Sequence, residues 1–205
     1  EGCSGGGGRF DAGFAYYMPQ IWTSDNTDAV SRLTIQYGTS LVYPISMTTA
    51  HVSAIPNHQT GRKTSFETRG NAAMSAVFGY ELDLTKMSQE DKDQVKEQVA
   101  CYKEIRKLIQ YGNFYRLKSP VETNQSAWMF VSDDKRDVCV MTFQVLAFAQ
   151  PCLTKTKLYG LDPELEYENL ETHEIFGGDE LMELGFYDPI VHQDYTSKMY
   201  RFKGI

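Results

Sequence analysis

The 205-residue chain predicts two fold classes in succession, an α/β unit over residues 1–112 and an all-β domain over residues 113–205. In the first part, apolar strand-like runs alternate with amphipathic helical stretches, which is typical of parallel α/β units. After Gly112 the sequence changes to short runs in which apolar and polar residues alternate, separated by clusters of turn-forming residues. That pattern indicates an antiparallel β-sandwich, so we expect a domain boundary near residue 112.

The first part is too short to be a complete α/β fold. It holds about three strand–helix units, whereas a closed barrel of this type needs eight. So few units cannot cover both faces of a parallel sheet. We therefore expect residues 1–112 to be the C-terminal part of a (β/α)8 TIM barrel that other sequence completes. The start at Glu1, without an initiator Met, also favours a piece of a longer polypeptide.

The first elements of this unit follow from apolar periodicity and capping residues. The apolar run 12–22 leads into a helix that Asn26 or Thr27 is expected to cap. Residues 40–47 form a short apolar run, which predicts a buried strand. The polar stretch 48–69 is long for a connection, and we expect a functional or mobile loop there.

The later elements have clearer signals. Asn71 is expected to cap a short turn, and alternating apolar residues over 78–84 predict a strand. Ser88 begins a variant of the capping box, and helical spacing then continues until Gly112 closes the helix. Trp128 lies in a strand pattern and is expected in the core. The strands expected in the second domain are residues 114–117, 127–131, 138–148, 155–158 and 198–202.

Charge and cysteine usage exclude several classes of protein. The net charge of −7 argues against a nucleic-acid partner, which would require clustered Lys and Arg. No uninterrupted apolar run reaches about 18 residues, so no membrane-spanning helix is expected. The four cysteines, Cys3, Cys101, Cys139 and Cys152, show no CxxC spacing, so no metal site is predicted. Cys101 and Cys139 lie in apolar patterns and are expected to be buried thiols. The low cysteine content fits a cytoplasmic location.

Asp25 is the first candidate for chemistry, because it follows an apolar run and precedes a helix. At the carboxyl end of a barrel strand, a carboxylate would lie on the face where active sites form. Next to Trp22 it could act as a general acid. The local sequence by itself favours another role, the helix N-cap. Asp28 suits the first turn of that helix, where a negative charge complements the dipole.

A glycine run, Gly5–Gly8, follows Cys3 and allows the backbone to approach a ligand closely. No Lys-Ser or Lys-Thr follows it, so a phosphate-binding loop is not indicated. A linker and a bend that touches a ligand's hydroxyls are the remaining interpretations. Cys3 is a weak candidate nucleophile, because His51 and His58 fall in the polar loop and no histidine is an evident base.

Several stretches of sequence are long and specific. They are Cys3–Asp11, Pro19–Ala29, Ile35–Ser40, Ala50–Arg62, Gly79–Leu84 and Gly177–Met182. These stretches resemble the α-galactosidases of glycoside hydrolase family 36, and the last two resemble the bacterial members. The resemblance covers essentially the whole chain.

The resemblance implies an architecture and a set of site residues. Family members have an N-terminal β-sandwich, a central (β/α)8 barrel and a C-terminal β domain, of which this chain would be the last part. By resemblance, Asp25 would be the catalytic acid/base, and Cys3 and Gly6 would contact galactose. The substrate would be a raffinose- or melibiose-type α-galactoside, hydrolysed with retention and without a cofactor. The implied partners are that substrate, the N-terminal remainder of the same enzyme and further copies in a homo-oligomer, often a homotetramer.

The chain departs from the family pattern in one respect. The family's nucleophile is the aspartate of a Lys-Trp-Asp motif, and neither that motif nor an upstream sugar-binding pair of aspartates occurs here. A retaining glycosidase needs two carboxylates about 5 Å apart, of which this chain supplies one. One alternative is an inactive fragment that serves as a structural or carbohydrate-binding module. Another is a related α-N-acetylgalactosaminidase or galactosyl transferase.

Overall fold

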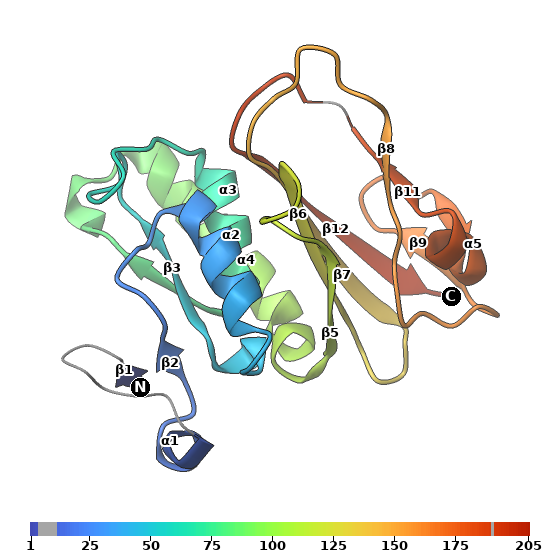
Figure 1. Cartoon of the computed structure of the whole chain (residues 1–205), viewed down its shortest axis with the longest axis horizontal. Helices are drawn as coiled ribbons and strands as arrows, with labels where there is room; N and C mark the ends of the chain where they lie inside the picture. Colours follow the sequence, from blue (N-terminus) through green and yellow to red (C-terminus); the bar gives the residue numbers. More distant parts are fainter. Residues whose placement is uncertain (4–11, 190) are drawn as a thin grey trace. The chain divides into compact units, whose positions relative to one another are not determined.

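The computed structural model describes residues 1–3, 12–189 and 191–205 and divides into two compact units, residues 1–106 and 107–205. Figure 1 shows the mixed α/β elements of the first unit and the antiparallel strands of the second. The predicted fold class, α/β followed by all-β, is confirmed. The division falls inside one helix, and a domain boundary near residue 112 stays a prediction.

The first unit is built from short parallel strands in chain order. β1 pairs in parallel with β2, a single parallel bridge joins Ile21 to Thr48, and β3 pairs in parallel with β4. Successive strands are therefore neighbours, and their carboxyl ends meet at one edge of the sheet. The strands are β1 (Gly2–Cys3), β2 (Ile21–Trp22), β3 (Thr49–Ser53) and β4 (Val77–Glu81).

Helices occupy the connections between these strands. Ser65 caps α3 and Ser88 caps α4, whose Asp91 N–H donates to the Ser88 hydroxyl at 3.0 Å, as the capping pattern predicts. Within the described ranges no helix is both long enough and apolar enough to cross a membrane. The helices are α1 (Ala12–Tyr17), α2 (Ala29–Thr39), α3 (Phe66–Met74) and α4 (Gln89–Tyr111), with 3-10 turns η2 (Ile45–Met47) and η3 (Leu84–Lys86).

The strand predicted over residues 40–47 is wrong. Leu41 and Val42 are exposed in a turn, and the strand β3 begins only at Thr49, inside the stretch predicted as a loop. β3 is buried although it is polar, because its hydroxyl groups are satisfied. Thr49 Oγ1 donates to the Ile21 carbonyl at 2.9 Å, and Ser53 Oγ donates to the Thr27 carbonyl at 3.2 Å.

Two helix starts also differ from the sequence prediction. Asp28, rather than Asn26 or Thr27, caps α2 by accepting from the Ser31 N–H at 3.0 Å. α3 begins at Phe66, whereas the sequence predicted only a short turn from Asn71. Both true caps lie in polar stretches that offer several Ser, Thr, Asp and Asn residues, so local sequence could not select between them.

The second unit consists of two antiparallel sheets. The larger has six strands in the order β10-β9-β12-β7-β6-β5, and β11 pairs with β8 in the smaller. The three longest strands coincide with predicted runs, whereas the short strands β9, β10 and β11 and the helix α5 were not expected. The elements are β5 (Asn113–Lys118), β6 (Gln125–Val131), β7 (Asp137–Gln144), β8 (Thr154–Thr156), β9 (Glu166–Asn169), β10 (Ile175–Gly177), α5 (Gly178–Glu183), β11 (Phe186–Asp188) and β12 (Thr196–Gly204).

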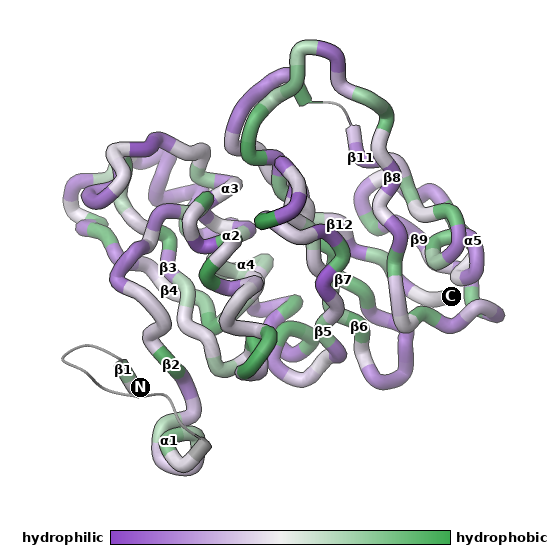
Figure 2. The backbone as a smooth tube through the Cα atoms, in the orientation of Figure 1, coloured by the Kyte–Doolittle hydropathy of each residue, from purple (hydrophilic) through white to green (hydrophobic). Residues whose placement is uncertain are grey.

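The core of this unit lies between the larger sheet and the segment that carries β8, α5 and β11. Met129, Val140 and Phe202 from the sheet pack with Leu181 and Phe186 from the covering segment. Figure 2 shows hydrophobic residues along β6 and β7, which are neighbouring interior strands of this sheet. Trp128 is 1% exposed and Cys139 is fully buried, as predicted, whereas Cys101 is only half-buried.

Candidate active site

The carboxyl ends of β1 and β2 bring two of the predicted site residues to the same sheet edge. Cys3 is the last residue of β1 and lies opposite Trp22, the last residue of β2. Asp25 follows Trp22 by three residues, before α2 begins. Parallel register thus places both residues at neighbouring strand ends. The predicted contact residue Gly6 lies outside the described residues.

The Asp25 side chain is exposed, and hydrogen bonds hold both its carboxylate and its main chain. Its carboxylate oxygen Oδ1 accepts a hydrogen bond of 2.8 Å from the Trp22 indole Nε1. Its main-chain carbonyl accepts a hydrogen bond of 3.1 Å from the Gln59 side-chain amide, which comes from the segment after β3. Because a hydrogen bond weakens steeply when the donor leaves the line to the acceptor, the indole N–H restrains the orientation of this acid.

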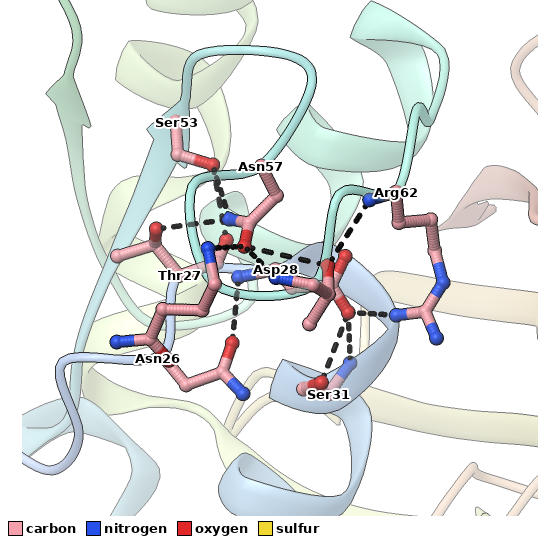
Figure 3. Close-up of polar contacts among 9 residues, drawn as sticks. Asn26, Thr27, Asp28, Ser31, Ser53, Asn57 and Arg62 are labelled. Atoms are coloured by element: carbon pink, nitrogen blue, oxygen red, sulfur yellow. Dashed lines mark hydrogen bonds and ion pairs between the residues drawn. The ribbon is translucent and has the colours of Figure 1, made fainter.

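The helix-capping role that local sequence offered to Asp25 belongs to Asp28. The Asp28 carboxylate is buried, accepts from the Ser31 N–H at 3.0 Å and from the Ser31 hydroxyl at 2.9 Å, and forms an ion pair with Arg62. Figure 3 shows this carboxylate between Ser31 and Arg62. Its oxygens are therefore committed to structure, while Asp25 is left exposed at the strand end.

Asn57 ties the segment after β3 to the segment after β2 (Figure 3). It is buried, and its amide nitrogen donates to Thr27 Oγ1 at 3.3 Å and to Ser53 Oγ at 3.4 Å. Its amide oxygen accepts from the main-chain N–H groups of Gln59 and Thr60 at 3.0 and 3.1 Å. This network fixes the turn that carries Gln59, and through it the backbone of Asp25. No local pattern identifies Asn57 as a support for Asp25.

His51 was expected in the polar loop 48–69, and that expectation is wrong. It lies in the middle of β3, and its ring centroid is 4.7 Å from that of Trp22 with an interplanar angle of 43°. Burial lowers the pKa of His51; Glu1 opposes this change and the positive charge of Arg32 adds to it. The imidazole is therefore neutral at neutral pH.

Two buried arginines hold the backbone of β3. Arg32 Nη2 donates to the Thr49 carbonyl at 2.7 Å, and Arg69 Nη1 donates to the Ser53 carbonyl at 2.6 Å, at the two ends of the strand. Burial lowers the pKa of Arg32 to about 10, which still leaves the guanidinium charged at neutral pH. The strand that carries His51 is thus anchored at both ends. Among the described residues, no group of three or more His, Cys, Asp or Glu is placed to hold a metal ion.

Comparison with known proteins matches both parts of the chain to one enzyme family. Residues 1–112 match the family model described as Melibiase, and residues 125–202 match the model of the glycosyl hydrolase family 36 C-terminal domain. Alpha-galactosidase 1 of Pediococcus pentosaceus is 67% identical over all 205 residues, and alpha-galactosidase Mel36A of Lactobacillus acidophilus is 63% identical over the same length. The chain spans 28% of the length of each of these relatives.

Solved structures agree with this match. A variant of the family 36 α-galactosidase AgaA from Geobacillus stearothermophilus, in complex with raffinose, superposes with a TM-score of 0.95 at 57% identity. That alignment covers 99% of this chain and 28% of the other. Another AgaA variant, in complex with stachyose, superposes with a TM-score of 0.94 at 57% identity and covers 98% of this chain and 28% of the other.

Proposed function

This chain belongs to glycoside hydrolase family 36, and we propose that it forms one side of the active site of a retaining α-galactosidase. The observation that carries the proposal is the carboxylate of Asp25, exposed at the carboxyl end of β2 and oriented by the Trp22 indole. Active sites of barrel enzymes form at that end of the strands. The complexes of AgaA variants with raffinose and stachyose support a substrate that carries a terminal α-linked galactose.

Asp25 would act twice in the reaction. In the first step it would protonate the glycosidic oxygen as the bond to the anomeric carbon breaks and a second carboxylate attacks that carbon. In the second step it would remove a proton from the water that hydrolyses the glycosyl–enzyme intermediate. The attacking carboxylate would come from sequence outside this chain, because the Lys-Trp-Asp motif that carries the family's nucleophile does not occur here. Asp28, the nearest other acid along the chain, is bound to the first turn of α2 and to Arg62.

Cys3 and Gly6 would contact hydroxyl groups of the galactose. The position of Cys3 beside Trp22 at the adjoining strand end supports this role for the thiol. The role of Gly6 rests on the family resemblance alone. No cofactor is needed, because both chemical roles belong to carboxylates.

The test is the substitution Asp25→Asn in the α-galactosidase that carries this chain. We expect kcat with raffinose to fall by about 10²- to 10⁴-fold, the range for loss of a general acid. The bond-breaking step should suffer much less with 4-nitrophenyl α-galactoside, because nitrophenolate leaves without protonation. A matched control is Asp133→Asn, which alters an exposed acid in the β domain and should leave both rates unchanged. Unchanged turnover of both substrates by Asp25→Asn would remove Asp25 from the mechanism.

A further inference from the structure

His51 lies between the residue that orients Asp25 and a glycine on the next strand. On one side its ring is 4.7 Å, centroid to centroid, from the Trp22 ring of β2. On the other side it lies opposite Gly79 of β4 in the parallel register. A Cβ atom at residue 79 would stand 2.7 Å from His51 Cδ2 and 2.9 Å from His51 Nε2, distances that real side chains do not adopt. The imidazole therefore fits in this position only because residue 79 is glycine.

Trp22 needs such support if its indole is to orient Asp25. The second side-chain torsion of tryptophan is broad, so the ring is free to tilt unless a neighbour restrains it. The hydrogen bond from Nε1 to Asp25 weakens steeply as the donor leaves the line to the oxygen. A ring packed against the indole restricts that tilt. Since Arg32 and Arg69 anchor both ends of β3, His51 presents its ring from a rigid element.

We propose that His51 is a positioning residue for the general acid, which acts by holding the Trp22 indole in the orientation that fixes the Asp25 carboxylate. This inference rests on the proposed function of Asp25. His51 itself touches neither the substrate nor the transferred proton. In its neutral form it packs on the indole as an aromatic ring.

A residue that works through the general acid has a specific kinetic signature. Misplacement of the acid slows the first chemical step most for substrates whose leaving group must be protonated. Raffinose releases an alkoxide-type oxygen and needs the proton, whereas 4-nitrophenyl α-galactoside releases a stable phenolate. A residue that merely supports the fold would lower the rate with both substrates by the same factor.

The experiment uses two substitutions, one that removes the imidazole and one that displaces it. His51→Ala removes the ring, and Gly79→Ala forces it away from its position without altering Trp22 or Asp25. In the complete enzyme, each should lower kcat with raffinose by roughly 10- to 100-fold. With 4-nitrophenyl α-galactoside each should change the first step by less than about threefold. His192→Ala, at an exposed histidine of the β domain, is the matched control and should change neither rate.

The outcomes separate this inference from the proposed function. If Asp25→Asn discriminates between the two substrates while His51→Ala and Gly79→Ala slow both equally, the positioning role is wrong and the role of Asp25 stands. If Asp25→Asn slows both substrates equally, the proposed role of Asp25 is wrong, and the positioning role of His51 is wrong with it. If His51→Ala does not fold, Gly79→Ala is combined with Trp22→Phe, which removes the indole N–H. Because both changes act through the same hydrogen bond, kcat of the double variant with raffinose should fall no further than that of the worse single variant. Fully additive losses would overturn the inference.

Discussion

At the scale of residues, two aspartates three positions apart have opposite environments. Asp28 is 2% exposed and accepts from the first turn of α2 and from Arg62. Asp25 is exposed and contacts the Trp22 indole. Substitution of an acid that is buried in a structural network lowers the free energy of unfolding of the protein. Substitution of an exposed acid at a strand end changes that free energy little. The same side chain thus serves structure at one position and is available for chemistry at the other.

This contrast predicts how substitutions at the two aspartates affect stability. Asp28→Ala removes an N-cap and one side of the ion pair with Arg62, so we expect the free energy of unfolding to fall by about 2 kcal/mol or more. Asp28→Asn keeps an acceptor for the Ser31 N–H and should cost less. Asp25→Asn should change stability by no more than about 0.5 kcal/mol. Urea unfolding of the three variants checks the order, and a destabilised Asp25→Asn would contradict it.

At the scale of elements, the sequence predicted those segments whose burial follows apolar periodicity. The helix that begins at Gln89 and the strands β6, β7 and β12 lie where alternating or helical spacing indicates them. β3 was missed because its buried residues include Thr49 and Ser53, whose hydroxyl groups are satisfied by carbonyls of distant segments. A single sequence does not reveal such partners, so the apolar run 40–47 was the better match to a strand pattern and was wrong.

Alanine substitution at two glycines should change the free energy of unfolding in opposite directions. Gly38 lies in α2, and among the described residues no packed neighbour comes within 4 Å of where its Cβ would stand. Gly38→Ala should therefore raise the free energy of unfolding by up to about 1 kcal/mol through helix propensity. Gly185, between α5 and β11, has φ of +74°, and a Cβ there would lie 2.4 Å from the Thr156 carbonyl oxygen. Gly185→Ala should lower the free energy of unfolding by about 2 kcal/mol or more. Thermal unfolding of both variants tests this, and equal shifts would contradict it.

At the scale of the whole molecule, the candidate site could be predicted only in part. The resemblance of the segments around Cys3 and Asp25 to family 36 gave the candidate residues. The network that holds Asp25 could not be predicted, because Gln59, Asn57 and His51 come from a stretch read as a polar loop. These residues reach Asp25 only after β2 and β3 are aligned side by side. The chain spans 28% of the length of alpha-galactosidase 1 of Pediococcus pentosaceus, so these contacts describe only the part of the candidate site that the 205 residues contain.

The 205-residue polypeptide by itself should lack α-galactosidase activity. Retaining hydrolysis needs two carboxylates about 5 Å apart on opposite sides of the anomeric carbon. This chain offers Asp25 at the strand ends, while Asp28 is engaged by Ser31 and Arg62. We therefore expect no turnover of 4-nitrophenyl α-galactoside by this polypeptide, even when near-ultraviolet circular dichroism shows a packed fold, whereas the complete enzyme turns it over. Turnover by the polypeptide alone that Asp25→Asn abolishes would place both carboxylates within these 205 residues and would overturn the proposed division of the site.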